Sequence, residues 1–521
     1  MEQPAPRRRA DDRRRQRVPH CGHRRGADAR GRAATPSKPS CNRENHVNES
    51  SVETPLRNER GATASLASWL AGTRFEALPQ EVVEHVKWCF IDTVSCGLGG
   101  SRTDEATALL ELARSTGSGA SGFTIFGAGA RFGMLQAAQT NRVLINALDF
   151  DDTVIGTGHM SSVAVAAALA IGEHLHSDGR DLITALALAY EMPLRLRQAV
   201  NPTLTAFRST FERVDSGVHF CSTVVAGALL GLGAVAFQDA LGLTGHLRPW
   251  HVTTPPMSEH GMPQWFKVTQ GDVVVPGLQA ALLAADGFPG DREMFDQQRN
   301  YAALVGSDRY DSTLLQRGFE PPFLLMGIGF KAQPCCRHIS AFAEAVERFR
   351  ARTGCRADQV RRIRARTHLW TTENLPHTDP QHMIGAQFSM PHGLAMTMLG
   401  VPPGPAWYTE TALFGAAARE LRHRVELVHD EQAQHHYDVE RRYAGAVEIE
   451  TVDGVVHREF VPAPKGAADN AFDESDHRAK LFDLAAAAGL ARDRAAHLWD
   501  RMRALESLED LRQLTALLEP D

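Results

Sequence analysis

The chain has 521 residues, and its length alone predicts roughly two to four domains rather than one compact core. Hydrophobic residues make up 43% of the sequence and charged residues 23%, which excludes collagen-like, mucin-like and wholly disordered proteins. The formal net charge of -6 is unevenly spread. Residues 1–43 carry 13 Lys and Arg against 4 acids and are therefore +9, whereas the rest of the chain is -15.

The Arg-rich beginning of the chain is predicted to be a disordered extension over residues 1–58. Residues 1–43 contain no Leu, Ile, Phe, Trp or Tyr, so they cannot bury enough apolar surface to offset the entropy of ordering. Three explanations are open: a tail that binds nucleic acid or a membrane, a transit peptide, and a start codon assigned too far upstream. Arginine runs without aromatic residues attract nucleic acid only nonspecifically, and Asp11 and Asp12 weaken the transit-peptide explanation. We expect a start assigned too far upstream or an inert extension, and no nucleic-acid partner.

The sequence shows neither a membrane-spanning pattern nor a disulfide pattern. No stretch reaches the roughly 18 uninterrupted apolar residues that a transmembrane helix needs. The 8 cysteines are scattered without a Cys-x-x-Cys pair, and a chain of this length does not need disulfides to be stable. We therefore expect a reduced, cytoplasmic protein with no membrane partner.

The first predicted helix begins at Pro79 and repeats apolar residues every four positions, at Val82, Val86, Phe90 and beyond. The glycines from Gly97 onward are expected to end it. Helices rich in Ala and Gly, a composition typical of the inside of a bundle, make residues 59–328 the first part of an all-α domain. These helices are predicted to open at Thr103 and to cover 133–148, 161–176, 180–200, 217–237 and 268–287.

The pattern changes after Gly329. We predict an α+β domain over 329–462, with two strands of alternating polarity around the Asp453-Gly454 turn. Beyond it, residues 463–521 return to helix and are expected to rejoin the first domain, so the chain is mostly α with an inserted α+β unit. No glycine-rich loop lies between a strand and a helix, so no nucleotide cofactor is expected. The individual elements are a helix at 338–353, strands at 360–370 and 447–460, and helices at 474–488, 491–504 and 506–518.

Polar residues in apolar surroundings are the candidates for chemistry. Between Leu148 and His159 the chain concentrates Asp149, two further acids and Thr153 next to glycines. Burying three acids together costs several kcal/mol unless cations or hydrogen-bond donors meet them. The alternative is a turn in which the Asp residues only cap the following element.

One histidine and two lysines stand in similarly apolar company. His219 opens a helix of Ala, Gly, Leu and Val, where the helix dipole favours a neutral imidazole that can accept a proton. Lys267 precedes a hydrophobic helix, and Lys331 lies where the two predicted domains should meet. Lysine is seldom found in such surroundings unless it faces an anion. The alternatives are a histidine satisfied by a carbonyl group and lysines on exposed loops.

A metal site is not predicted. Cys335, Cys336 and His338 are the densest group of metal-ligand types, but they lie too close together and no second Cys/His pair stands at zinc spacing. An iron–sulfur cluster would need more thiolates at wider spacing.

Taken together in chain order, five segments resemble the MmgE/PrpD family, and the resemblance runs from about residue 60 to the C-terminus. They are Ala147-Leu-Asp-Phe-Asp-Asp-Thr153 with His159, Gly217-Val-His219, Lys267 with Gly271, Phe330-Lys-Ala-Gln-Pro-Cys-Cys-Arg-His338, and Ala386-Gln-Phe-Ser-Met-Pro391. The resemblance implies a large all-α domain, an inserted α+β lid, a homodimer, and a site in the cleft between domain and lid that needs no metal or organic cofactor.

The resemblance also implies a catalytic set and a substrate class. The set falls on Asp149, Thr153, His159, His219, Lys267 and Lys331, and all six positions keep the residue type of the family. The residues around His219 and between Val154 and Gly158 depart from it, which puts the substrate in doubt more than the reaction class. Retention of all six argues against a non-catalytic scaffold.

The implied substrates are di- or tricarboxylates. We expect His159 to be the general acid or base, held by Asp149 or Thr153, and His219 to be a second proton-transfer group. Lys267 and Lys331, with His338, are expected to bind substrate carboxylates, because a fixed ammonium stabilises the charge that develops next to a carboxylate. A hydro-lyase like 2-methylcitrate dehydratase is the first expectation. A cis-aconitate-type decarboxylase comes second and an iminodisuccinate-type epimerase third.

Overall fold

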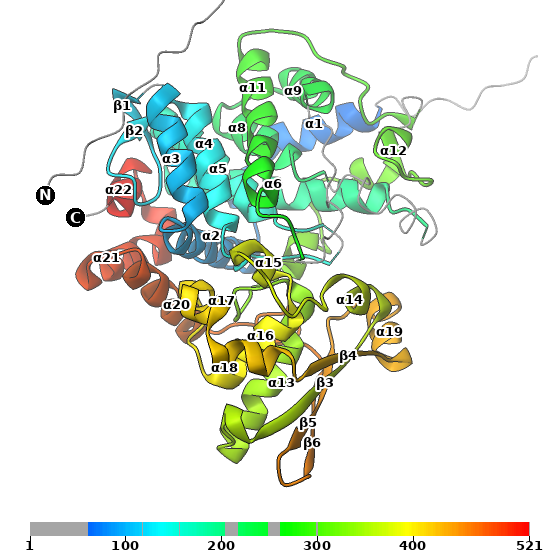
Figure 1. The fold of residues 1–521 in the computed structure, drawn as a ribbon. Coiled ribbons are helices and arrows are strands. Elements are labelled where there is room, and N and C mark those ends of the chain that lie inside the picture. Colours follow the sequence, from blue (N-terminus) through cyan, green and yellow to red (C-terminus); the bar gives the residue numbers. More distant parts are fainter. Residues whose placement is uncertain are drawn as a thin grey trace, which may run out of the picture. The chain divides into compact units, whose positions relative to one another are not determined.

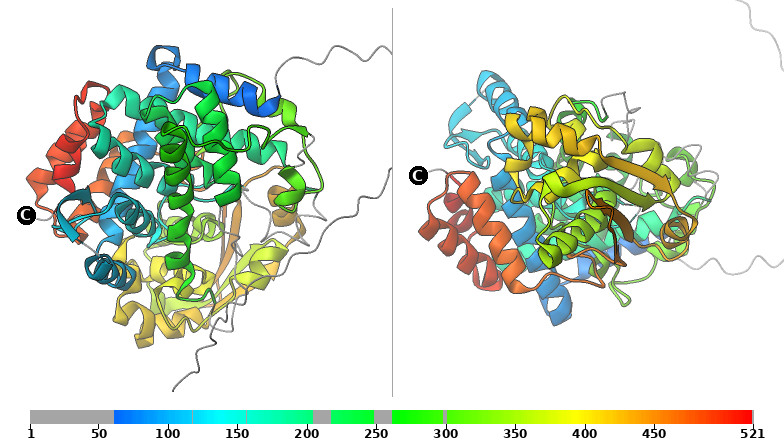
Figure 2. Two further views of the ribbon diagram at one scale, coloured as in Figure 1. Left: turned by 90° about the horizontal axis from the view of Figure 1, so that it is seen from above. Right: turned by 60° about the horizontal axis from the view of Figure 1, so that its bottom comes forward.

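The computed structural model describes residues 61–116, 118–155, 157–203, 217–247, 261–297 and 301–519, which belong to one compact unit, Asn58–Asp521. Within these ranges helices dominate and the strands form small sheets (Figures 1 and 2). The chain is therefore mostly α, as predicted. The Arg-rich extension predicted over 1–58 lies outside the described residues.

The first region, from α1 to α12, is a bundle whose inner helices are buried on nearly every side. Every residue of α5 from Met160 to Glu173 is buried, which explains its run of Ala and Val. α6 packs against α8, and α11 packs against both α8 and α9. The helices are α1 (Ala62–Gly72), α2 (Gln80–Gly100), α3 (Asp104–Thr116), α4 (Met134–Asn146), α5 (Met160–Leu175), α6 (Gly179–Ala199), α8 (Phe220–Leu229), α9 (Ala234–Leu247), α10 (Phe266–Thr269), the 3-10 turn η3 (Gln270–Val274), α11 (Val275–Ala285) and α12 (Tyr301–Leu304).

The predicted end of the first helix is confirmed, because α2 ends at Gly100, among the glycines that begin at Gly97. Gly97 itself lets the helix pass the ring of Phe126, since a Cβ there would lie 2.6 Å from that ring. The predicted helix 217–237 is instead two helices, since Gly231 adopts a φ of 65° between α8 and α9. Only a residue without a Cβ adopts that backbone readily.

The first region is also not entirely α. Strands β1 (Ser118–Thr124) and β2 (Arg131–Phe132) form an antiparallel pair between α3 and α4. The sequence Ser-Gly-Ala-Ser-Gly-Phe-Thr has no alternation of apolar and polar residues, so its pairing could not be read from the pattern.

The second region, from α13 to β6, combines helices with a mixed four-stranded sheet of order β4-β3-β5-β6. β3 pairs parallel with β4 and antiparallel with β5, and β5 pairs antiparallel with β6 around Asp453-Gly454, as the hairpin signal predicted. α13 packs against β5 and β6. The elements are α13 (Arg337–Thr353), β3 (Val360–Thr367), α14 (Leu369–Asn374), α15 (Met383–Gln387), α16 (Met390–Leu399), α17 (Glu410–Phe414), α18 (Ala416–Arg422), β4 (Val425–His429), α19 (Glu431–Asp438), β5 (Gly445–Thr451) and β6 (Val456–Val461).

The C-terminal helices return to the first region, where α20 (Glu474–Ala487) packs against α2 (Figure 1). Residues 481–518 share one hydrophobic core with the first region, whereas most of the apolar residues between 335 and 461 form another. The helix predicted at 506–518 is wrong, because this stretch consists of short turns. The elements are α21 (Arg492–Arg503), η9 (Leu505–Ser507), α22 (Arg512–Thr515) and η10 (Ala516–Leu518).

One helical stretch in the described ranges, Phe266–Ala285, is long and apolar enough to cross a membrane by length and composition, with a mean hydropathy of 1.2. It contains Lys267 and Asp272, and its α11 part packs against α8 and α9. These contacts are those of a core helix.

Candidate active site

The loop between α4 and α5 carries the predicted acids and the predicted proton-transfer histidine. α4 ends at Asn146, and α5 begins at Met160 with His159 as its N-cap. Asp149 has a φ of 51°, a left-handed backbone that residues other than glycine seldom adopt. The two helix ends therefore hold both ends of the loop, and the loop turns sharply at Asp149.

Two lysines from distant segments meet at Asp149. Lys267 Nζ donates to Asp149 Oδ1 at 2.5 Å. Lys331 Nζ donates to Asp149 Oδ2 at 2.9 Å and to the carbonyl oxygen of Asp149 at 2.6 Å. The lysines are 1% and 0% exposed, so both are buried and paired with a carboxylate of the chain itself. Side-chain and backbone contacts with Lys331 together hold the unusual backbone of Asp149.

His159 joins the same carboxylate from the other side of the loop. Its Nε2 lies 3.4 Å from Asp149 Oδ1 and its Nδ1 lies 3.0 Å from Asp151 Oδ1. Its side chain is 21% exposed, whereas those of Asp149 and Asp151 are 2% and 0% exposed. The imidazole is therefore the member of this group that solvent and small molecules can reach.

The charges of the group fix its protonation. Burial alone would raise the pKa of Asp149, but Lys267 and Lys331 outweigh it and hold that pKa well below its usual range. Burial at Asp151 is likewise outweighed, chiefly by His159, and its pKa is lowered. Burial lowers the pKa of His159 despite Asp151, so the imidazole is neutral at neutral pH. The resting site thus holds two anions, two cations and a neutral base.

The two lysines differ in how firmly they hold their protons. Burial lowers the pKa of Lys267, although Asp149 and Asp151 oppose it. At Lys331 the same two carboxylates more than offset burial, and the pKa is raised. Lys267 is therefore the lysine that gives up a proton more readily.

A third buried lysine, Lys480 on α20, ties the backbone around the site together. Its Nζ donates to the carbonyl oxygens of Phe150 at 2.7 Å and Lys331 at 3.2 Å, and pairs with Asp92 Oδ1 at 2.7 Å. The neighbours of Asp149 and the segment of Lys331 are thus fastened to one ammonium from the C-terminal helices.

The second region contributes to the site through α15. Gln387 Nε2 donates to the carbonyl oxygen of Ala147 at 2.6 Å. The ring of Phe388 lies 5.5 Å from Lys267 Nζ and at 6.1 Å from the ring of Phe266. The loop between α4 and α5 and the helix of Lys267 both contact this region.

Thr153 and His219 are the next two predicted site residues. Thr153 forms a backbone bridge with Gly329, at 2.9 and 3.1 Å, which brings the segment of Lys331 beside the loop. His219 is buried at the start of α8 with its ring 4.4 Å from that of Phe220, and its role as a second proton-transfer group stays a prediction.

His338 belongs to an aromatic cluster in the second region. Its Nδ1 lies 3.0 Å from His368 Nε2, and the rings of Trp370, Tyr437 and Tyr443 lie within 5.3 Å of its own. Burial lowers the pKa of His338 well below its ordinary value, with His368 adding to the effect. Lys331, which pairs with Asp149, lowers this pKa further, and the expected role of His338 in substrate binding stays a prediction.

Three contributors to the site were missed by the sequence reasoning. Asp151 lies in the acid-rich loop, but nothing in the pattern separates it from its neighbours. Asn146, which accepts from Lys267 at 3.0 Å and donates to Asp151 at 2.8 Å, ends an ordinary apolar helix. Lys480 lies in a helix whose sequence is typical of a surface helix, and nothing in that sequence indicates that Lys480 is buried.

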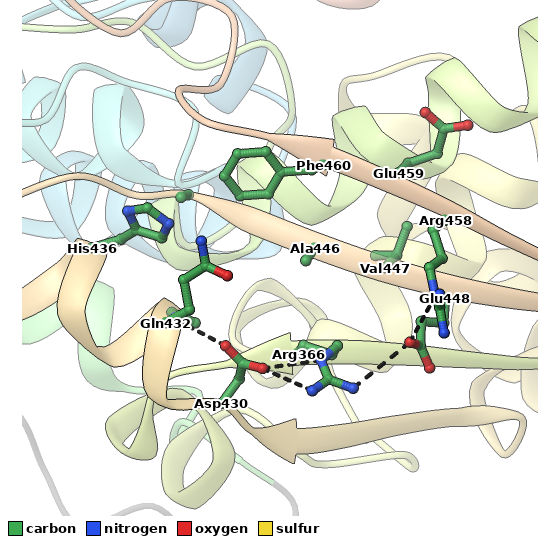
Figure 3. A pocket seen from close by; sticks show the side chains of 12 residues that line it. Arg366, Asp430, Gln432, His436, Ala446, Val447, Glu448, Arg458, Glu459 and Phe460 are labelled. Carbon is green, nitrogen blue, oxygen red and sulfur yellow. Dashed lines mark hydrogen bonds and ion pairs between the residues drawn. The ribbon is translucent and has the colours of Figure 1, made fainter.

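A hollow of about 480 Å³ lies elsewhere, between α19 and strands β5 and β6 (Figure 3). Its arginines are already paired: Arg366 with Asp430 at 2.9 Å, and Arg458 with Glu448 at 3.2 Å. None of the residues around Asp149 lines it, so it is not the candidate site. In the described ranges no three His, Cys, Asp or Glu side chains are placed to share a metal ion.

Family models match most of the chain. The model of the MmgE/PrpD N-terminal domain matches residues 64–312, and that of the MmgE/PrpD C-terminal domain matches residues 334–505. The chain belongs to the MmgE/PrpD family. The resemblance to this family is thereby confirmed.

Curated relatives of this MmgE/PrpD protein carry one activity in their names. A cis-aconitate decarboxylase of Aspergillus terreus is 24% identical over 88% of this chain and 96% of its own length. The mouse and human cis-aconitate decarboxylases are 24% and 23% identical, again over 88% of this chain and over 94% and 95% of their own lengths. These relatives support a lyase family but not the dehydratase expectation in particular.

Proposed function

We propose that this protein is a cofactor-independent lyase that acts on a di- or tricarboxylate, with decarboxylation of an unsaturated tricarboxylate such as cis-aconitate as the first candidate reaction. The observation that carries the proposal is the meeting of Lys267, Lys331 and His159 at one buried carboxylate, Asp149. Membership of the MmgE/PrpD family and the names of the relatives support it.

The chemistry follows from the fixed charges. When carbon dioxide leaves a carbon next to a C=C bond, the bonding pair forms a new double bond, and the pair of the old one moves to the carbon beside a second carboxylate. The negative charge then spreads onto that carboxylate, and an ammonium held nearby stabilises this state more than the substrate. A proton delivered to the same carbon completes the reaction.

His159 is the proposed source of that proton, with Asp149 and Asp151 holding the ring. The free site keeps the imidazole neutral. A bound polycarboxylate adds negative charge, and this favours the imidazolium form. Proton uptake would therefore accompany substrate binding.

The neutral resting state of His159 favours a second candidate, dehydration, in which a neutral imidazole first removes the proton next to a carboxylate. The pH dependence of kcat/KM separates the two, because it reports the free enzyme. A reaction that needs the imidazolium slows as pH rises through the pKa of His159. A reaction that needs the neutral base speeds up over the same range.

The second region is proposed to act as a lid over this site. Gln387 and Phe388 on and beside α15 already contact the loop of Asp149 and the segment of Lys267. The homodimer and the cytoplasmic location stay predictions.

The direct test is to incubate the purified protein in D₂O with cis-aconitate, 2-methylcitrate, citrate and iminodisuccinate and to follow each by NMR. We expect loss of carbon dioxide from cis-aconitate with one deuterium incorporated, and at least a hundredfold less turnover by His159→Asn and Lys267→Met. His246→Asn, a surface variant at a side chain that is 66% exposed, is the matched control. No change in any of the four compounds would contradict the proposal.

A further inference from the structure

Arg142 is a buried cation whose donors are not all used. It lies on α4 and is 4% exposed. Its Nη2 donates to Gln270 Oε1 at 2.9 Å, but among the residues that the structure describes its buried Nε and Nη1 have no hydrogen-bond partner. No carboxylate of the described residues lies within ion-pair distance of it. Buried charged donors without partners are costly, and such a group calls for a functional explanation.

The position of Arg142 on α4 directs it toward the candidate site. Arg142 and Asn146 are four residues apart and therefore share one face of the helix. Asn146 contacts both Lys267, at 3.0 Å, and Asp151, at 2.8 Å. Gln270, which holds the guanidinium, follows Lys267 by three residues in the next turn. The elements that position Lys267 thus also position Arg142.

Among the described residues, the anions near Arg142 are already paired with other cations or with His159. Lys267 and Lys331 are both paired with Asp149, and Asp151 is a second anion beside them. Burial lowers the pKa of Arg142 to about 10, with Asp151 opposing the effect, so the guanidinium remains charged at neutral pH.

We propose that Arg142 binds one carboxylate of the substrate and so forms a subsite beside the Asp149 group. This inference rests on the proposed function, because it assigns a place to one carboxylate of the polycarboxylate substrate. Nε–H and Nη1–H point to different sides of the guanidinium, and either one can donate a charge-assisted hydrogen bond to a carboxylate oxygen. Lys267 and His159 recognise one part of the ligand, and the Arg142 subsite recognises one further carboxylate. The site therefore favours ligands that carry this additional carboxylate.

The test measures binding of three unreactive probes by calorimetry. Tricarballylate has three carboxylates, glutarate lacks its central one, and methylsuccinate lacks a terminal one. For Arg142→Met we expect tricarballylate to bind about 10- to 100-fold more weakly, which corresponds to one charged hydrogen-bonding contact. One of the two dicarboxylates lacks the carboxylate that Arg142 binds. The Kd of that dicarboxylate should differ by no more than about threefold between the wild type and the variant.

Stability supplies a second readout that a structural arginine would not reproduce. Without ligand, Arg142→Met should melt at or above the wild-type temperature, because it removes a buried charge with unpartnered donors. Arg195→Met is the matched control. Arg195 is also buried, but it pairs with Glu191 at 2.8 Å and donates to backbone carbonyls. That variant should melt at a lower temperature and keep the wild-type preference among the three probes.

Each outcome decides between the proposals. The role of Arg142 is overturned if Arg142→Met loses the same affinity for all three probes, or if it binds tricarballylate as tightly as the wild type does. In both cases the binding of probes by the wild type leaves the proposed function intact. If wild type binds none of the probes and turns over no polycarboxylate, the proposed function falls and the subsite falls with it.

Discussion

Replacing Lys480 by Met tests whether the site depends on a lysine from the C-terminal helices. The change keeps the length of the side chain but removes an ammonium that is 5% exposed and pairs with Asp92 at 2.7 Å. Breaking a buried ion pair by removing one partner costs about 3–5 kcal/mol, since the other charge stays buried and unpaired. The carbonyl groups of Phe150 and Lys331 lose a donor as well.

The assay is urea unfolding followed by circular dichroism and by fluorescence, because coincident transitions justify a two-state free energy. We expect Lys480→Met to lower the free energy of unfolding by about 3–5 kcal/mol. The double variant Lys480→Met with Asp92→Leu should recover much of this loss, because a buried ion pair can often be exchanged for apolar residues at little cost. A loss below about 1 kcal/mol for Lys480→Met, or a double variant as unstable as the two single losses added together, would refute the reasoning.

Three further predictions concern protonation and charge. His159→Asn should lower turnover by about 10²–10⁴-fold with little change in melting temperature, and a pH–rate profile that keeps the wild-type shape would contradict its role as the titrating group. Asp149→Asn leaves two buried lysines without their carboxylate, so their pKa values fall below that of the unfolded chain. The stability deficit should therefore shrink between pH 7 and pH 9 in denaturation experiments. Buried His368, His392 and His477 have pKa values lowered to about 4, 4 and 3, chiefly by burial, so they stay neutral in the fold. Each contributes stability that is present above pH 6.5 and falls by about 1.4 kcal/mol per pH unit below it. The urea midpoint of His392→Gln should therefore fall less with decreasing pH than that of the wild type, and an equal fall would contradict this.

The position of the helices could largely be predicted from the sequence because the signals are local. The start at Pro79, the apolar stripe that follows it and the Asp453-Gly454 turn each depend on residues a few positions apart. The predicted helix 217–237, which is divided at Gly231, shows the limit of such signals. Gly97 makes room for Phe126 inside a helix and Gly231 separates two helices, and the two glycines look alike until the packing partner is known.

By itself the sequence determined which residue types are available and the family to which they belong: acids on a loop after an apolar helix, a histidine before the next helix, and lysines in apolar surroundings. Only the tertiary structure decided that Lys267 and Lys331 share Asp149, that Lys480 fastens the backbone of the site, and that Arg142 is left with unused donors. Residues more than a hundred positions apart are brought together by packing, and the pairing of buried charges depends on the few ångströms between them, which no local pattern encodes.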